Sequence, residues 1–280
     1  RCGLTQEQAA QKLGKSRSAL ANSLRLLNLP ENVLELLKSG FINIGHAKVI
    51  LSLPTPELQE QAAQIIADAY AAGHKIYIFG CTHSAILAED VFYRAGAPAF
   101  WRPLWGPGMS ITTTPGFLTS AVEHSEEIGN EVIRCSQMAA GDVLVLASTS
   151  GKNGAPVAVA DSALKRGAKL IILTSSSYRN QKGNHSAIPN LWAFEDKAVI
   201  IDNHVPCGDA SIKVKECPMG PVSTIAGSFL VHTLSALSIE KIMEKGLTPP
   251  VFLSSNAPGG LAHNRKLLED PAVRGAFLLP

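Results

Sequence analysis

A cluster of small hydroxyl residues follows an apolar run near the middle of the chain, where residues 143–157 read VLVLASTSGKNGAPV. The run stops at Ser148-Thr149-Ser150-Gly151, and a helix-compatible segment follows from Pro156 to Arg166. Unpaired N–H groups at the start of a helix favour an anion. Serine and threonine hydroxyls add donors, and glycine allows close approach. The segment has neither the lysine position of a P-loop nor three-glycine dinucleotide spacing, so it predicts a site for a phosphorylated small molecule rather than a nucleotide.

Two more loops of this kind follow other apolar runs. Gly80-Cys81-Thr82-His83-Ser84 comes after KIYIFG at 75–80, and Thr174-Ser175-Ser176-Ser177 comes after KLIILTS at 169–175. Loops at the carboxyl ends of parallel strands meet in one crevice, where α/β proteins bind ligands. Ser/Gly turns that only cap helices remain the structural alternative.

The elements that position these loops alternate between strand and helix. Short Val/Ile/Leu-rich runs are typical of strands buried on both faces, and helical patterns lie between them. The sequence therefore predicts a doubly wound α/β domain with a parallel five-stranded sheet. The predicted strands are 75–80, one near 99–101, 143–148, 169–175 and 198–203, and the predicted helices include 57–72, 84–95, 157–166 and 222–245.

The first 54 residues have a helical pattern throughout and differ in charge from the rest. They carry seven Lys/Arg and three Asp/Glu, whereas residues 55–280 carry eighteen and twenty. Thr5 can cap a first helix, with Gln8 as its capping-box partner, and Gly14 can end that helix. A second helix from Ser16 to about Leu27 then completes a helix-turn-helix. The prolines of LPTPEL at 53–58 suggest a linker, so we expect domains at 1–54 and 55–280.

Residues 3–54 resemble the helix-turn-helix region of the ParB/KorB partition proteins. The resemblance rests on GLTQEQAAQKLGKSRSALANSLRLLNLP and on the GHA at 45–47 within LLKSGFINIGHAKVILSLP. It implies binding of double-stranded DNA through a recognition helix from Ser16 to Arg25. A plain helical packing module is the alternative interpretation. The residues predicted to contact DNA are Lys15, Arg17, Ser18, Asn22 and Arg25.

Residues 57–269 resemble the SIS (sugar isomerase) family, within a bacterial subfamily related to phosphosugar isomerases and etherases. The segments that carry the match include FGCTHSAILAEDVFYRAG, VLVLASTSGKNGAPVAVA, GAKLIILTSSS, VIIDNHVPCGDA, GPVSTIAG and PPVFLSSNAPGGLAHNRKLLE. The resemblance implies a flavodoxin-like fold, a phosphosugar ligand and subunits that pair. With the loop pattern it gives a predicted set of ligand-binding residues: Thr82, Ser84, Ser148, Thr149, Ser150, Asn153, Thr174 and Ser175.

Two positions depart from the subfamily pattern. Thr82 stands where a glycine usually precedes His-Ser, and Leu261-Ala262 replace an acidic pair before His263-Asn264. A side chain at Thr82 narrows the approach of a ligand, and the second change removes charge from a site segment. Both weaken the case for catalysis more than the case for the fold.

Aldose–ketose isomerisation needs a base and an acid, roles that Glu and His fill. The predicted catalytic residues are His83, Glu89 and His263, each with a structural role as its alternative. Glu123, Glu126 and Glu127 are further candidates, which we expect on a solvated helix face. The His, Cys, Asp and Glu positions have no convincing metal spacing, so neither a metal nor another cofactor is predicted.

Composition limits the remaining function classes. A hydrophobic share of 46% fits a globular protein, and no apolar run reaches the roughly 18–20 residues that span a bilayer. Five scattered cysteines without a C-x-x-C pair are typical of reduced cytoplasmic thiols.

Three interpretations of function stay open at this point. In the first, the chain binds a phosphosugar, with isomerase or lyase activity uncertain, and forms a homo-oligomer. In the second, it is a DNA-binding regulator whose SIS domain senses a phosphosugar. In the third, residues 1–54 are a remnant or an artificial junction, because the chain begins at Arg1 without the other domains of partition proteins.

Overall fold

The computed structural model describes residues 5–14, 20, 24, 35, 38, 39 and 56–278. The chain divides into two compact units, Arg1–Leu53 and Pro54–Pro280, and each is considered by itself. In the first unit, α1 spans Gln6–Lys12. The N–H of Thr5 donates to Oε1 of Gln8 at 3.0 Å, and the N–H of Gln8 donates to Oγ1 of Thr5 at 3.3 Å. This reciprocal pair confirms the predicted capping box.

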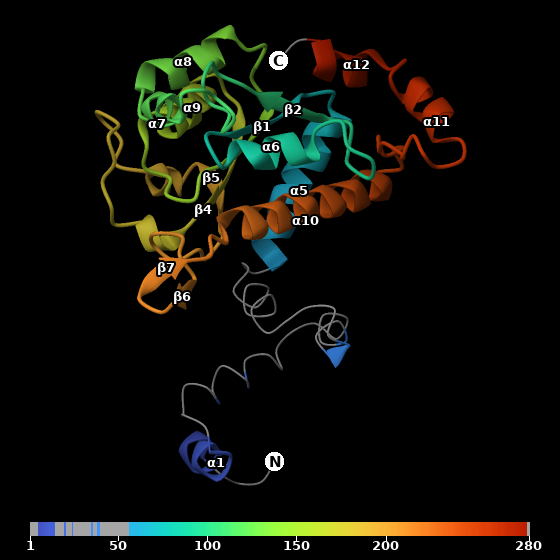
Figure 1. Ribbon diagram of the computed structural model, residues 1–280. Coiled ribbons are helices and arrows are strands. Elements are labelled where there is room, and N and C mark those ends of the chain that lie inside the picture. The colour runs from blue at the N-terminus through green and yellow to red at the C-terminus, as the bar shows by residue number, and fades with distance from the viewer. Residues whose placement is uncertain are drawn as a thin grey trace. The chain divides into compact units, whose positions relative to one another are not determined.

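The second unit is built on a parallel sheet of five strands in the order β2-β1-β3-β4-β5 (Figure 1). Along the chain the strands are β1 (Ile76–Gly80), β2 (Trp101–Leu104), β3 (Val143–Ala147), β4 (Lys169–Thr174) and β5 (Ala198–Asp202). The continuous apolar runs are buried along their whole length in β1 and β3. The prediction of a doubly wound α/β fold with a parallel five-stranded sheet is confirmed.

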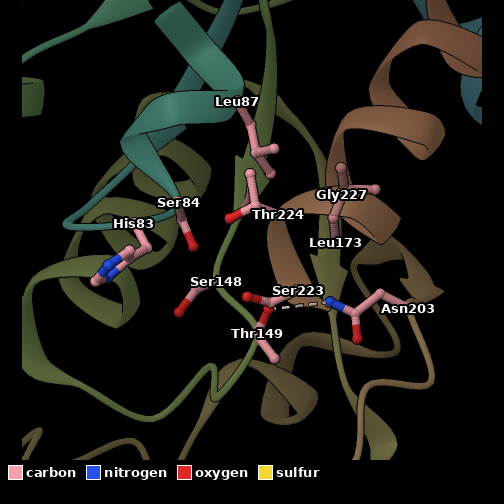
Figure 2. A pocket seen from close by; sticks show the side chains of 11 residues that line it. His83, Ser84, Leu87, Ser148, Thr149, Leu173, Asn203, Ser223, Thr224 and Gly227 are labelled. Carbon is pink, nitrogen blue, oxygen red and sulfur yellow. Dashed lines mark hydrogen bonds between the residues drawn. The ribbon is translucent and has the colours of Figure 1, made fainter. Parts of the chain in front are cut away.

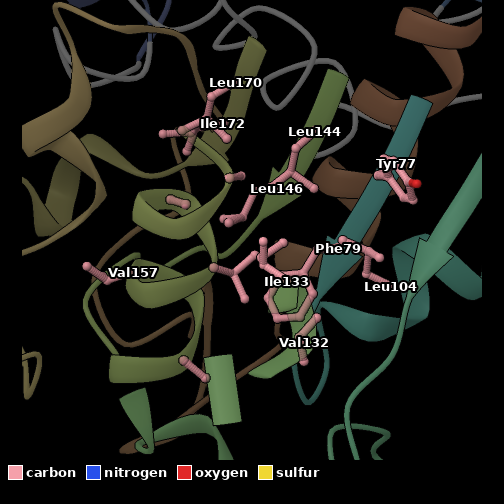
Figure 3. Close-up of a cluster of buried hydrophobic side chains, with 14 of the residues drawn as sticks. Tyr77, Phe79, Leu104, Val132, Ile133, Leu144, Leu146, Val157, Leu170 and Ile172 are labelled. Carbon is pink, nitrogen blue, oxygen red and sulfur yellow. The ribbon is translucent and has the colours of Figure 1, made fainter. Parts of the chain in front are cut away.

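One face of the sheet packs against α7 (Gly116–Glu123), α8 (Glu126–Cys135) and α9 (Gly154–Lys165), which lie together in Figure 1. Alternate strand residues such as Phe79, Leu146 and Ile172 point into this layer and are fully buried. Figure 3 shows them beside Ile133 and Val157 of the covering helices. The carboxyl ends of the strands and the start of α9 are therefore held on one rigid core.

The other face is covered by α5 (Pro56–Ala71) and α10 (Ser223–Glu244), with α6 (Ala85–Val91) beside α10 (Figure 1). Small buried residues such as Ala62 and Ala63 bring α5 close to the sheet and to α10. At the far end of α10, Nζ of Lys245 lies 2.6 Å from a carboxylate oxygen of Asp68 on α5. The predicted helices 57–72 and 222–245 are confirmed, whereas the helix predicted over 84–95 is shorter.

Several elements have bounds that the sequence did not predict. They are α7 and α8, the hairpin β6 (Ile212–Val214) and β7 (Cys217–Met219), the 3-10 turns Ser176–Tyr178 and Leu191–Phe194, α11 (Gly260–Leu267) and α12 (Pro271–Leu278). The hairpin lies in the segment that joins β5 to α10. Among the described residues, no helix is both long and apolar enough to span a bilayer.

Candidate functional site

A shallow hollow opens at the carboxyl ends of the strands. Its walls come from the loops after β1, β3 and β5 and from the first turns of α10, and Figure 2 shows their side chains converging on one space. The lining residues are His83, Ser84, Leu87, Ala147, Ser148, Thr149, Leu173, Asn203, Ser223, Thr224 and Gly227. Four predicted residues, His83, Ser84, Ser148 and Thr149, are thus brought together at the edge where α/β folds bind ligands.

The loop after β3 is held from several directions. Oγ of Ser148 accepts the N–H of Gly151 at 3.2 Å, and Oγ1 of Thr149 accepts from the Asn203 amide at 3.1 Å. Neither hydroxyl donates its own proton to an acceptor within the described residues, so each can donate to a ligand. In the described chain, the N–H groups of Thr149 and Ser150 donate to no protein acceptor. The loop therefore presents a fixed set of donors, which suits an anion.

Gly151 allows this loop to pack closely. Its φ is +59°, and a Cβ there would lie 2.5 Å from Oγ1 of Thr174. The Thr174 hydroxyl donates to the carbonyl of Thr149 at 3.3 Å, and Ser175 N–H donates to the same carbonyl at 3.0 Å. Glycine is thus required by both the backbone angle and the space.

The loop after β4 does not face the hollow, although Thr174 and Ser175 were predicted to bind the ligand. Thr174 and Ser175 are both 0% exposed and do not line the hollow. Oγ of Ser175 donates to the carbonyl of Val205 at 2.6 Å and accepts the N–H of Ser177 at 3.2 Å. Their hydroxyls are used within the protein because the segment turns inward into a 3-10 helix, so their placement favours support of the site over direct ligand contact.

The loop after β1 places His83 and Ser84 at the rim of the hollow (Figure 2). Gly80 lets the backbone of α6 come against the end of β1, because a Cβ on Gly80 would collide with the Ser84 carbonyl. Thr82 adopts φ +54° and donates its N–H to the carbonyl of Met109 at 2.8 Å. Thr82 lies beside the hollow rather than in its lining.

Glu123, at the end of α7, is a further residue of this region. Burial raises the pKa of its carboxyl, while a hydrogen bond from Asn153, the charges of His124 and His83, and a hydrogen bond from Thr82 lower it. Asn153 and Thr82 flank the hollow from the loops after β3 and β1. Glu123 therefore lies half-buried between two predicted site segments, which corrects the expectation of a solvated helix face.

The neighbouring acidic residues have other surroundings. Glu126 accepts hydrogen bonds from the N–H and hydroxyl of Ser186, and Glu127 is exposed. The residue types along this segment do not predict the burial of Glu123. That burial depends on how α7 packs against the loops, which sequence periodicity does not encode.

Two predicted catalytic residues lie away from the hollow. Glu89 is exposed on α6, where Oγ of Ser110 donates to it at 3.4 Å. Nε2 of His263 lies 2.9 Å from the carbonyl of Val251, which forms a bridge with Pro98 ahead of β2. That is the amino end of β2, so within one chain His263 is not brought to the carboxyl-end site.

Three polar lining residues were not in the predicted set. Asn203 follows β5, and Ser223 and Thr224 begin α10. All three fall in segments that carried the family resemblance, VIIDNHVPCGDA and GPVSTIAG, and this was the available signal. Ser150 and Asn153 lie in the same loop as Ser148 without lining the hollow.

Two further predictions concern DNA binding and metal binding. Lys15, Arg17, Ser18, Asn22 and Arg25, the predicted DNA contacts, lie outside the described residues. Within the described residues, no group of three His, Cys, Asp or Glu side chains is arranged to hold a metal ion.

The fold and the polar hollow together define an α/β protein of the SIS class. The model of the SIS domain matches residues 56–175, and the model of the ParB HTH domain matches residues 1–72. The chain is 37% identical over 216 residues to a UPF0309 protein of Shouchella clausii, covering 76% of this chain and 87% of the relative. It is 35% identical over 232 residues to a UPF0309 protein of Oceanobacillus iheyensis, covering 80% and 94%.

The chain therefore belongs to the UPF0309 family of SIS-domain proteins, with a ParB-like helix-turn-helix segment at its N-terminus. Among solved structures, a phosphoheptose isomerase of Neisseria gonorrhoeae matches with a TM-score of 0.42 and 20% identity, over 65% of this chain and 84% of that one.

Proposed function

We propose that the SIS domain binds a phosphorylated sugar, with the phosphate on the loop Ser148–Asn153. The observation that carries this proposal is the convergence of free donors at the carboxyl end of β3, namely the Ser148 and Thr149 hydroxyls and the N–H groups of Thr149 and Ser150. Membership of an SIS family supports it. Three or four charge-assisted hydrogen bonds of about 1.5–3 kcal/mol each are enough for micromolar-to-millimolar affinity after the costs of binding.

Removing the two serine hydroxyls of this loop tests the proposal. Ser148→Ala with Ser150→Ala should abolish binding of hexose and amino-sugar phosphates in calorimetry while the thermal unfolding transition persists. Ser120→Ala, at an exposed position on α7, is the matched control. Unchanged affinity in the double variant would rule out this loop as the phosphate site.

For catalysis, we propose Glu123 and His83 as the acid–base pair of a sugar-phosphate isomerase. The Glu123 carboxylate would take the proton from the carbon next to the carbonyl while His83 gives a proton to the carbonyl oxygen. His83 would then take the proton of the neighbouring hydroxyl, so that this oxygen becomes the new carbonyl, and Glu123 would return its proton to the former carbonyl carbon. The raised pKa of Glu123 suits a base working near neutral pH. Only His83 among the three predicted catalytic residues lines the hollow.

Exchange of the substrate's carbon-bound proton with solvent deuterium tests this step. Glu123→Gln should abolish the exchange and leave binding of the sugar phosphate within about threefold. Glu127→Gln, at an exposed position on α8, should leave both unchanged. Exchange at the wild-type rate in Glu123→Gln would exclude Glu123 as the base.

The alternative function is a DNA-binding regulator whose SIS domain senses the sugar phosphate. The match of residues 1–72 to the ParB HTH domain favours it. We propose Lys15, Arg17, Ser18, Asn22 and Arg25 as its DNA contacts. Retention of a DNA fragment should fall steeply as salt rises, and Arg17→Ala with Arg25→Ala should lower both the affinity and the salt slope.

Lys165→Ala, on α9 of the SIS domain, is the control for the regulator proposal, because it removes a positive charge outside the helix-turn-helix segment. No retention of DNA by the wild-type chain at low salt would reject that proposal and leave the phosphosugar proposal untouched.

We further propose that copies of the chain pair, since α10 exposes Ile225 and Phe229 by 58% and 43%. Light scattering of the purified chain measures its oligomeric state, and a monomer would contradict the proposed pairing.

A further inference from the structure

The two walls of the hollow differ in hydrogen-bonding character. The β3 side offers donors, as described above. On the α10 side, Oγ of Ser223 donates its one proton to Oδ2 of Asp209 at 2.6 Å. A hydroxyl that has already donated can offer a ligand only lone pairs. Ser223, which lines the hollow in Figure 2, is therefore an acceptor on that side.

Asp209 also occupies the start of α10. Its Oδ1 accepts the N–H groups of Val222 at 2.9 Å and Ser223 at 3.0 Å. Val222, the N-cap residue, makes no side-chain cap of its own. A carboxylate from earlier in the chain thus fills the place where a ligand anion would otherwise bind a helix N-terminus.

The fold fixes this carboxylate in place. The chain after β5 runs through the hairpin β6–β7 and returns, and Oγ of Ser211 donates to the carbonyl of Gly220 at 2.6 Å to close its base. The N–H of Gly208 donates to the Tyr178 hydroxyl at 2.8 Å. Asp209 itself adopts φ +51°, a left-handed angle that Asp tolerates better than most residues. These contacts bring a residue 14 positions away onto the first turn of α10.

The charges then favour one kind of ligand. A helix N-terminus is equivalent to roughly half a positive charge, which a full carboxylate more than offsets. Ser223 therefore presents an acceptor hydroxyl next to a carboxylate charge at the start of α10, while the loop after β3 presents donors. A phosphate fits the donors of the β3 loop, and a ligand hydroxyl fits the lone pairs of Ser223, whereas a second acid on the ligand beside Ser223 would meet repulsion from Asp209.

We propose that Asp209, acting through Ser223, makes the site selective for phosphosugars whose carbon frame carries hydroxyls and no carboxylate. Sugar phosphates that bear a second acid, such as aldonic acid phosphates, are rejected. This inference rests on the proposed phosphosugar function and adds the substrate class to it. Asp209 acts here as a positioning residue that sets specificity, not as a catalytic one.

A matched pair of open-chain ligands tests the inference. Sorbitol 6-phosphate and 6-phosphogluconate differ at one end, where a CH₂OH replaces a carboxylate. In calorimetry at pH 8, the wild-type chain should bind sorbitol 6-phosphate at least about tenfold more tightly than 6-phosphogluconate. Asp209→Asn keeps an oxygen for the two N–H groups but removes the charge, and should reduce the gap to within about threefold.

A second variant guards against a folding defect in Asp209→Asn. Ser223→Ala removes the acceptor hydroxyl and leaves Asp209 in place, so it should weaken sorbitol 6-phosphate by about fivefold while 6-phosphogluconate stays weak. Equal affinities for the two ligands in the wild-type chain, or a tenfold gap that survives in a folded Asp209→Asn variant, would overturn the inference alone. Failure of every hexose phosphate, sorbitol 6-phosphate included, to bind would instead overturn the proposed function and the inference with it.

Discussion

Replacing Gly151 by alanine should destabilise the SIS unit through two separate effects. The residue has φ +59°, which costs an alanine about 1 kcal/mol. The new Cβ would also lie 2.5 Å from Oγ1 of Thr174. Moving that hydroxyl breaks its bond to the Thr149 carbonyl, at a further cost of about 1 kcal/mol or more. The expected loss of unfolding free energy is therefore about 2–3 kcal/mol.

Gly73→Ala separates the two effects. Gly73 has φ +77°, but nothing lies within 4 Å of a Cβ placed there. This control should carry only the backbone cost of about 1 kcal/mol. Urea denaturation of both variants measures the difference, and calorimetry with a hexose phosphate should show about a tenfold loss of affinity for Gly151→Ala only. A Gly151→Ala variant within about 0.5 kcal/mol of Gly73→Ala, with unchanged affinity, would refute the described packing of the loop.

Three further predictions concern single buried groups. The Tyr77 hydroxyl is fully buried and has no hydrogen-bond partner among the described residues, and burial raises its pKa to about 12. In urea denaturation, Tyr77→Phe should therefore leave the unfolding free energy unchanged or raise it by about 1 kcal/mol. A loss of that size would reveal a hydrogen-bond partner of the hydroxyl. Burial raises the folded-state pKa of Glu123, so the wild-type chain loses folding free energy as the pH rises and the buried carboxyl ionises. Glu123→Gln should therefore become more stable relative to wild type as the pH rises from about 4 to 8. A stability difference that is the same at both pH values would contradict the raised pKa. Burial also raises the pKa of the Cys81 thiol to about 12. An alkylating reagent should therefore label the exposed thiols of Cys135, Cys207 and Cys217 in the folded chain, and should label Cys81 only after unfolding. Peptide mapping measures which thiols are labelled.

The sequence determined the architecture of the SIS unit to a large extent. Continuous apolar runs such as VLVLA are typical of strands buried on both faces in a parallel sheet, so the strands β1, β3, β4 and β5 follow from the local pattern. The same holds for the capping box of Thr5 and Gln8, whose bonds join residues three apart. The prediction that hydroxyl-rich loops gather at the strand ends also follows, since topology forces those ends to one edge.

Which hydroxyls face the hollow was decided by tertiary packing. Ser148 and Thr149 keep donors for a ligand, whereas Thr174 and Ser175, of the same residue types after the next strand, turn inward and bond to the protein. Glu123 is half-buried only because α7 packs against the loops after β1 and β3. Residue type sets which hydrogen bonds a side chain can donate or accept, but not which partner the folded chain places beside it.

Contacts between distant parts of the chain decided the rest. Asn203, Ser223 and Asp209 join the site through the return of the chain from β5 to α10, and His263 is held near the opposite end of β2. Local periodicity carries no information about such pairings, because their energies depend on burial and on the register between elements far apart in sequence. The amino acids alone thus determined a loop of hydroxyl residues and glycine at the end of a strand in a parallel sheet. The tertiary structure decided which of its hydrogen-bond donors stay available and which acidic residues lie nearby.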